Sequence, residues 1–255
     1  MNKLVIGYFY KKDLNLYGDN GNVEVLKYRT QKRNIPIEIL EISGDTDIYS
    51  DKYKNINFIF MGGGPDSAQN FVYQDLYNNK KEFLKHYIDE GGVGLFICGS
   101  YQLLGNYYKD SSGKTLKGLD IFDLYTEHFG DDKPRCIGNT VARISPRISR
   151  NPLFKKISML EPSITGFENH GGRTFLKDKN CALGYITKGW GNNGDDYTEG
   201  ILYNNSIGTY FHGPFLARNP HIADYLIAKS LGLKDLKKLD DTLQKLAFTA
   251  SKKLK

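Results

Sequence analysis

Short apolar segments alternate with helical segments through the first hundred residues, and this alternation limits the folds open to the chain. Each apolar segment has the length of a buried strand and is bounded by glycines or a polar loop. The predicted strands cover residues 4–10, 35–42, 57–61 and 94–97, and predicted helices cover residues 22–34 and 80–90. Repeated strand–helix units place parallel strands in one sheet with helices on both faces. The first half therefore predicts an α/β fold with a mostly parallel central sheet flanked by helices.

Beyond about residue 110 the pattern changes to short strand-like runs that follow one another. These runs cover residues 139–144, 163–167, 182–187, 200–203 and 207–211, and helical patterns return at 220–232 and 242–254. The Asn204-Asn205 pair is a turn signal between the last two runs. We therefore expect one domain over residues 1–232 with a strand-rich second half, followed by a basic helical C-terminal tail over residues 233–255.

The composition, with 40% hydrophobic and 25% charged residues, is typical of a globular protein in water. Three cysteines, Cys98, Cys136 and Cys181, lie at no metal-ligand spacing, and their odd number argues against a disulfide framework. The apolar run at residues 4–10 is too short to span a membrane and does not resemble a signal peptide. These features predict a cytoplasmic protein with a free thiol and no metal site.

The net charge of +6 is concentrated at the C-terminus, where residues 234–255 hold seven lysines and three aspartates. The rest of the chain is nearly neutral, so the charge does not predict a nucleic-acid-binding surface. Two interpretations of the tail stay open. It is either a solvated terminal helix or a segment that docks on an acidic partner or on the anionic inner face of the membrane.

One segment combines the features of a nucleophile turn. Residues 94–105 read Gly-Leu-Phe-Ile-Cys-Gly-Ser-Tyr-Gln-Leu-Leu-Gly, which predicts a buried strand, a sharp turn at Cys98 and a helix. A residue between a central parallel strand and the next helix faces the crevice where α/β folds bind ligands. Backbone amides and the helix dipole at that position favour a thiolate. We interpret Cys98 as a nucleophile rather than as the small buried hydrophobe that a free cysteine usually is.

A second segment supplies a base for that thiol. Residues 207–214 read Ile-Gly-Thr-Tyr-Phe-His-Gly-Pro and place His212 at the end of another predicted strand. A histidine there takes the thiol proton and later gives it to a leaving amine. His170 is the serious rival among the remaining histidines. A cysteine with a histidine base predicts an enzyme that attacks an amide.

A triple glycine follows the third predicted strand, so its amides face the same crevice. Acyl transfer needs hydrogen-bond donors for the developing oxyanion. We expect Gly63 and Gly64 to provide them together with Gly99, the residue after the cysteine. No Gly-Lys-Ser/Thr follows the glycines, and a Walker-type loop is absent from the sequence, so any ATP-dependent step is expected on another chain.

These motifs resemble a known family. Residues 98–105 and 208–213 are similar to the paired signatures of class I glutamine amidotransferases of the cobyric-acid-synthase type. Residues 14–22, 167–174 and 189–193 more narrowly resemble the glutaminase subunits of bacterial lipid II isoglutaminyl synthases. The resemblance extends from the first strand to about residue 232 and covers the basic tail poorly.

The resemblance implies a function as well as a fold. Glutamine would be hydrolysed through a γ-glutamyl thioester, and the ammonia would pass to a second subunit similar to a Mur ligase. That partner would use ATP and Mg²⁺ to amidate the α-carboxylate of D-glutamate in the lipid II peptidoglycan stem. No cofactor is expected on this chain.

The resemblance also assigns roles to residues. Cys98 matches the family's nucleophile and His212 its base, while Arg135 matches a residue that holds the substrate glutamine, a task suited to a guanidinium fork. Gln102 lies one helical turn beyond the cysteine and is expected to line the same pocket. Asp19 matches a functionally important position in the narrower family.

Two departures from the family pattern bear on the site. Many class I enzymes have a glutamate two residues after the histidine, and Pro214 stands there in this chain. The acid that orients the histidine must come from elsewhere, with Asp19 as the first candidate and Glu168 in reserve. Ser100 replaces the second glycine of the usual Cys-Gly-Gly turn.

Two other functions stay open on the sequence alone. One is a scaffold or regulatory subunit that kept the amidotransferase fold without turnover, an interpretation that the missing glutamate favours. The other is a stand-alone cysteine hydrolase of γ-glutamyl or peptide bonds.

Overall fold

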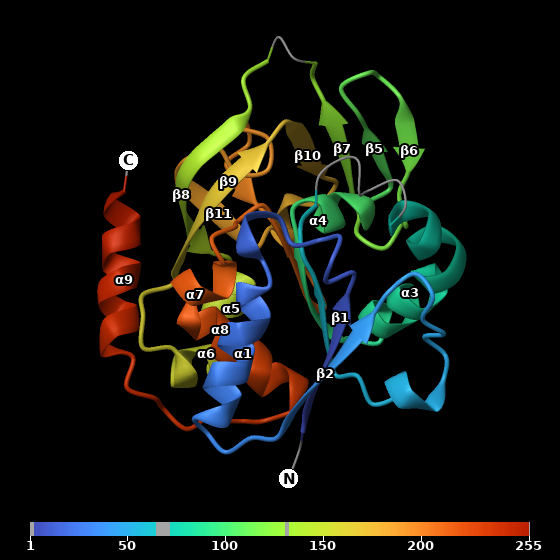
Figure 1. Cartoon of the computed structure of the whole chain (residues 1–255). Coiled ribbons are helices and arrows are strands. Elements are labelled where there is room, and N and C mark those ends of the chain that lie inside the picture. Colours follow the sequence, from blue (N-terminus) through green and yellow to red (C-terminus); the bar gives the residue numbers. More distant parts are fainter. Residues whose placement is uncertain (1–2, 65–71, 131–132, 255) are drawn as a thin grey trace.

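A six-stranded sheet forms the centre of the molecule (Figure 1). A computed structural model describes residues 3–64, 72–130 and 133–254. The sheet has the order β13-β14-β4-β3-β1-β2, and every neighbouring pair is parallel except β13 with β14. Its strands are β1 (Leu4–Phe9), β2 (Ile37–Ile42), β3 (Phe58–Met61), β4 (Val93–Ile97), β13 (Ile201–Tyr203) and β14 (Asn205–Thr209). The expected α/β fold with a mostly parallel sheet is confirmed.

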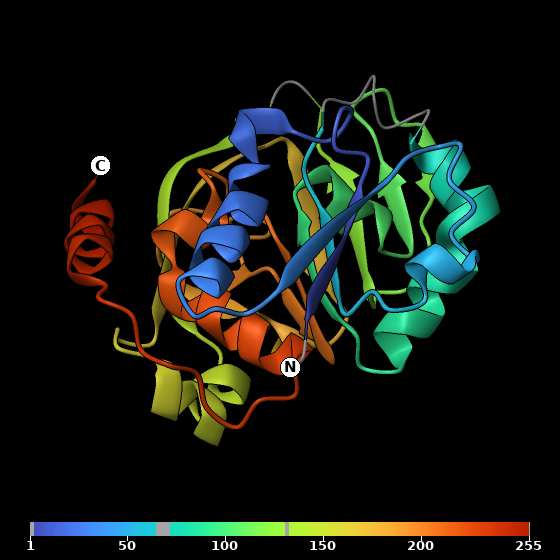
Figure 2. The ribbon, with the colours of Figure 1, turned by 60° about the horizontal axis from the view of Figure 1, so that its bottom comes forward.

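Helices cover both faces of this sheet (Figures 1 and 2). On one face α1 packs against α7 and α8, and α3 lies on the other side of the sheet. Leu84 and Ile88 on the inner side of α3 are fully buried, as the apolar spacing of that segment predicts. These helices are α1 (Gly21–Gln31), α3 (Lys81–Asp89), α4 (Gly99–Leu103), α7 (Phe215–Arg218) and α8 (Pro220–Ser230).

The second half is rich in strands, as expected, and forms two further four-stranded sheets. One has the order β10-β7-β5-β6 and the other the order β12-β11-β8-β9. Their strands are β5 (Tyr107–Lys109), β6 (Thr115–Lys117), β7 (Leu124–His128), β8 (Cys136–Ile144), β9 (Ser163–His170), β10 (Gly172–Leu176), β11 (Gly184–Lys188) and β12 (Thr198–Glu199). The sequence did not predict β5, β6, β7 and β10, because such short strands depend on their pairing partners more than on local propensity.

The prediction of a strand at residues 207–211 is two residues too late in the sequence. β14 occupies Asn205–Thr209, where the Cys98 amide donates to the Thr209 carbonyl at 2.8 Å. The chain then leaves the sheet, and the His212 amide donates to the Phe167 carbonyl at 2.8 Å. An apolar run continues through both environments, so its pattern does not show where the central sheet ends.

The remaining elements are short connections and the tail helix. They are the 3₁₀ helices Leu16–Gly18, Asp51–Tyr53 and Lys179–Cys181, the π-helix Leu76–Lys80, α5 (Pro146–Ser149), α6 (Pro152–Ile157) and α9 (Thr242–Lys253). The expected helix of the C-terminal tail is therefore present as α9, on the outside of the molecule (Figure 1). Within the described ranges, no helix is both long and apolar enough to cross a bilayer.

The tail is attached to the body of the molecule by buried contacts. Phe248 is the buried residue of α9, and its ring lies 5.5 Å from that of His221 in α8. Arg29 of α1 is buried and donates to the carboxylates of both Asp224 and Asp241. A boundary at residue 232 stays a prediction, because these contacts cross it.

Candidate active site

Cys98 lies between β4 and α4 in a backbone conformation that few residues adopt. Its φ of 52° and ψ of −108° place a non-glycine residue in a strained region, and Gly99 begins the helix directly after it. This is the geometry of a nucleophile turn, in which the side chain stands above the carboxyl edge of a parallel sheet. The predicted strand, turn and helix at this position are all present.

Ser100, which stands where the usual turn has a second glycine, is bonded to the ends of two strands. Its hydroxyl donates to the carbonyl oxygens of Met61 at 2.9 Å and Ile97 at 3.0 Å. The side chain is completely buried between the ends of β3 and β4. The serine therefore fastens the turn to two central strands.

His212 and Asp19 meet beside the thiol although 193 residues separate them in the sequence. His212 Nδ1 lies 3.0 Å from Asp19 Oδ1, and both side chains are completely buried. The other carboxylate oxygen of Asp19 accepts the Gly63 amide hydrogen at 2.9 Å. The aspartate is held in the turn between the 3₁₀ helix Leu16–Gly18 and α1, so the orienting acid comes from the N-terminal end of a helix.

The groups around His212 raise the pKa of its imidazole above the ordinary value. Burial by itself lowers it, but the hydrogen bond with Asp19, the neighbouring Cys98 sulfur and the charges of both groups raise the pKa to about 10. The imidazole is therefore a cation at neutral pH. It places a positive charge beside the Cys98 sulfur, and such a group is able to give a proton to a leaving nitrogen.

Gly63 has a different task from the one its position in the sequence predicts. A β-carbon there would lie 3.0 Å from His212 Cε1 and 3.1 Å from Cys98 Cβ, so it would push against both side chains. Its N–H donates to Asp19, so this amide is engaged with the carboxylate that contacts His212. The Gly99 amide, at the start of α4 and directly after the cysteine, is positioned to donate to an oxyanion.

Pro214, which stands where many relatives have a glutamate, packs at the start of α1. A β-carbon on Gly21 would lie 2.3 Å from Pro214 Cγ, so the proline ring fills the space above that glycine. Asp19 lies two residues before the glycine and His212 two residues before the proline. The contact between Gly21 and Pro214 therefore holds the segment of Asp19 beside the segment of His212.

The thiol opens into a cavity of about 250 Å³. Arg135 and Gln102 line it, as does Gly64, so these three predicted substrate-binding residues share the cavity with Cys98. The other lining residues are Leu16, Tyr108, His128, Asn169, His170, Gly171 and Gly172. A cavity of this volume accommodates a molecule the size of a free amino acid.

Two neighbours fix the predicted substrate-binding side chains. Arg135 Nε donates to Asn169 Oδ1 at 2.9 Å, and its Nη2 donates to the Asn169 backbone carbonyl at 3.1 Å. Gln102 Nε2 donates to the Tyr210 hydroxyl at 2.9 Å. Both side chains are thus oriented before any ligand binds, which lowers the entropy cost of binding.

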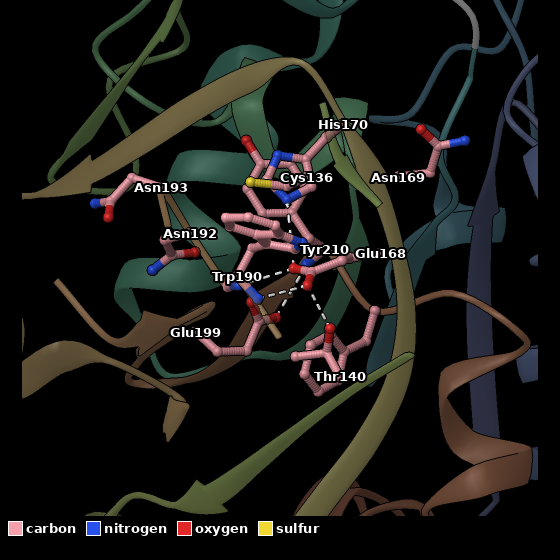
Figure 3. A network of polar contacts seen from close by, with 12 residues as sticks. Cys136, Thr140, Glu168, Asn169, His170, Trp190, Asn192, Asn193, Glu199 and Tyr210 are labelled. Carbon is pink, nitrogen blue, oxygen red and sulfur yellow. Dashed lines mark hydrogen bonds and ion pairs between the residues drawn. The ribbon is translucent and has the colours of Figure 1, made fainter. Parts of the chain in front are cut away.

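Glu168 and His170, the two reserve candidates, lie together in a separate buried network (Figure 3). The Glu168 carboxylate accepts the Trp190 amide at 2.7 Å, the Gly191 amide at 2.8 Å and the Thr140 hydroxyl. It therefore holds the turn at residues 189–193 and does not contact His212.

The ring of His170 closes the cavity from this side. It stacks on Tyr210 with ring centroids 3.6 Å apart, and its Nδ1 lies 2.7 Å from the Gly172 carbonyl oxygen. Burial lowers the pKa of His170, so the ring is neutral at physiological pH. Glu199 lies deeper in the network, and burial raises its pKa to about 8. His170 thus forms a wall of the cavity, and His212 is the histidine that meets Cys98.

His128 and Tyr108 line the cavity without having been expected there. They come from β7 and β5, two of the strands that the sequence did not predict. The only local signal was the short run Leu-Tyr-Thr-Glu-His at residues 124–128, whose alternation is too brief to identify a strand.

Comparison with known proteins agrees with this geometry. Residues 5–220 match the CobB/CobQ-like glutamine amidotransferase domain. The chain belongs to this family. The match covers the cysteine turn, the histidine and the aspartate of the site, and it confirms the resemblance read from the sequence. This amidotransferase is an enzyme of the glutamine-dependent class.

Two curated relatives extend over nearly the whole chain. The GatD subunit of lipid II isoglutaminyl synthase (glutamine-hydrolyzing) from Staphylococcus aureus is 39% identical over 236 residues, covering 92% of this chain and 88% of that protein. The corresponding subunit from Streptococcus pneumoniae is 38% identical over 234 residues, covering 91% and 82%. Among solved structures, PurLQS from Thermotoga maritima has a TM-score of 0.55 and 15% identity, covering 90% of this amidotransferase and 97% of that chain, which shows a shared fold.

Proposed function

We propose that this chain is the glutaminase subunit of a lipid II isoglutaminyl synthase. The observation that carries the proposal is the contact of His212 with both Asp19 and Cys98 at the end of a cavity that fits one amino acid. The similarity to GatD subunits, at 39% and 38% identity, supports the narrower assignment. A non-catalytic scaffold has no need for a strained cysteine turn and a buried cationic histidine.

The first half of the reaction forms a thioester. The Cys98 sulfur attacks the γ-carbonyl carbon of glutamine. The carbonyl oxygen becomes an oxyanion, which accepts hydrogen bonds from backbone N–H groups such as that of Gly99. When the intermediate collapses, the carbon–nitrogen bond breaks and the His212 imidazolium gives its proton to the leaving nitrogen. Ammonia leaves, and the γ-glutamyl group stays on sulfur.

The second half regenerates the enzyme. His212, now neutral, removes a proton from a water molecule that attacks the thioester carbonyl. The carbon–sulfur bond breaks, glutamate leaves, and the thiolate is again paired with the imidazolium. Asp19 keeps the ring in one orientation through both halves and stabilises its positive charge.

The use of the ammonia requires a second protein. We infer a Mur-ligase-like partner in a heterodimer, which binds ATP and Mg²⁺ and amidates the α-carboxylate of D-glutamate in lipid II. Ammonia is a nucleophile only in its unprotonated form, so direct transfer between subunits away from bulk water is chemically favourable. We place the pair in the cytoplasm, with the lysine-rich tail available to the inner face of the membrane.

Ammonia release by the purified chain tests the proposal. With L-glutamine we expect ammonia and glutamate in equal amounts, and more rapid release when a Mur-ligase-like partner from the same cell is added. Cys98→Ala is expected to abolish release while the fold and partner binding persist. Cys181→Ala, at a thiol away from the cavity, is the matched control and is expected to keep wild-type rates.

Other outcomes would favour other functions. Full activity on γ-glutamyl peptides without a partner would identify a stand-alone hydrolase. Partner binding without any glutamine turnover would identify a scaffold. Ammonia release that persists in Cys98→Ala would exclude this cysteine as the nucleophile.

A further inference from the structure

Two basic side chains converge at one wall of the cavity, although only one of them is suggested by the sequence. A β-carbon on Gly171 would lie 2.2 Å from His128 Nε2 and 3.3 Å from Arg135 Nη1. These nitrogens therefore stand over the same glycine, in the cavity that holds Cys98. A side chain at position 171 would occupy the space between them.

The orientation of His128 makes its Nε2 a donor. Its Nδ1 accepts the Gly130 amide hydrogen at 3.1 Å, so a neutral ring carries its hydrogen on Nε2. Within the described residues, no hydrogen bond to this Nε2 is found. On the other side of the wall, Asn169 engages Nε and Nη2 of Arg135, and Nη1 is the nitrogen that lies near Gly171.

The wall that carries these groups is rigid. Gly172 is paired with His128 in the β7–β10 ladder, and its carbonyl oxygen is bonded to His170 Nδ1 at 2.7 Å. A β-carbon on Gly172 would lie 2.7 Å from Gln102 Nε2. The two consecutive glycines thus leave a space that the histidine, the arginine and the glutamine share.

We propose that His128 is a second binding group for the α-carboxylate of the substrate, acting beside Arg135. A carboxylate has two oxygens, and donors from two sides satisfy both of them more fully than one guanidinium nitrogen does. The inference rests on the proposed glutaminase function and deepens it, since it makes the free α-carboxylate of an amino acid a requirement. Glutamine whose carboxylate is in a peptide bond is then a poor substrate.

Alkylation of Cys98 by 6-diazo-5-oxo-L-norleucine tests this in the full chain without a partner. The reagent keeps the α-carboxylate of glutamine and forms a carbon–sulfur bond with loss of dinitrogen. Intact-protein mass spectrometry at several concentrations separates the half-saturating concentration from the maximal rate. We expect His128→Ala to raise the half-saturating concentration about 10- to 100-fold, the value of a hydrogen bond to a charged group, with the maximal rate within about twofold of wild type.

Three controls make the result specific. Iodoacetamide has no α-carboxylate, so its rate with Cys98 is expected to be the same in His128→Ala and the wild type. His128→Gln, whose amide is a donor, is expected to recover part of the affinity. His86→Ala removes an exposed histidine of α3 and is expected to change neither rate.

Two results would overturn the inference about His128 alone. One is an unchanged half-saturating concentration in His128→Ala, and the other is an equal loss of rate with iodoacetamide, which would show a general disturbance of the thiol. Labelling of the wild type that never saturates would instead contradict the glutaminase assignment, and the inference with it.

Discussion

At the scale of single residues, the site depends on one carboxylate that is remote in sequence from the groups it serves. Asp19 binds the ring of His212 with one oxygen and the amide of Gly63 with the other. It therefore orients the base and fixes the glycine that separates base from thiol.

Asp19→Asn should reduce kcat/KM for glutamine by a factor on the order of 10²–10⁴, because an amide neither stabilises the imidazolium nor fixes its tautomer. Steady-state ammonia release measures the loss. Glu168→Gln is the comparison variant, since its carboxylate supports a turn and does not touch His212. A larger loss of turnover in Glu168→Gln than in Asp19→Asn, with both proteins folded, would reverse the assignment.

The raised pKa of His212 also makes stability depend on pH. The folded value of about 10 lies above the ordinary 6.5, so protonation favours the folded state. This stabilisation is fully present below pH 6.5 and is lost as pH rises through 10. Denaturant titrations of the wild type and Asp19→Asn should show a wild-type advantage that shrinks toward pH 10. A difference that is constant or grows with pH would show that the aspartate does not act through His212.

At the scale of elements, the start of α1 and the segment after β14 form one unit. The contact of Gly21 with Pro214 sets the distance between them, and the catalytic pair lies two residues before each. Other elements supply the thiol turn between β4 and α4 and the cavity wall between β7 and β10. Each part of the site is thus placed by a different pair of elements.

Gly21→Ala should separate the catalytic pair, because the new β-carbon would approach the rigid proline ring to 2.3 Å. We expect a loss of roughly 10- to 100-fold in kcat and about 1–3 kcal/mol in the free energy of unfolding. Adding Pro214→Ala removes the ring atoms that clash and should recover part of both losses, measured by ammonia release and denaturant unfolding. Additive losses in the double variant would show that the two residues do not interact in this way.

At the scale of the whole molecule, the C-terminal segment is continuous with the packed body. Arg29 donates to Asp241 beyond the expected boundary as well as to Asp224 within it, and Arg33 Nε donates to the Lys237 carbonyl at 2.6 Å. Both arginines are buried. The charge pattern alone indicates a detached basic tail. These contacts show instead that Lys237 and Asp241, at the start of the tail, accept hydrogen bonds from these two arginines.

Two truncations separate these roles. Residues 1–241 keep both partners of Arg29 and lose α9, with the packing of Phe248 and the ion pair of Lys252 with Glu161. Residues 1–232 in addition leave two buried arginines with unsatisfied donors. We expect the shorter form to be less stable than the longer one by about 1–3 kcal/mol in denaturant unfolding. Equal stability of the two forms would support a domain that ends at residue 232.

The sequence by itself determined the parallel sheet, the cysteine turn and the family. These follow from local patterns: apolar runs of strand length, glycines at strand ends, and a cysteine between a strand and a helix. Such patterns are legible in one chain because they reflect backbone geometry within a few residues. The histidine was found for the same reason, as the residue that ends an apolar run.

Only the tertiary structure decided which acid contacts His212, what Gly63 does and that His128 lines the cavity. Asp19 and Glu168 are equally acidic in the sequence, and their roles differ because one lies on α1's turn beside the histidine and the other beneath residues 189–193. His128 lies on a five-residue strand whose position is set by pairing with β10. Contacts between distant segments depend on packing, and packing leaves no local period in a sequence.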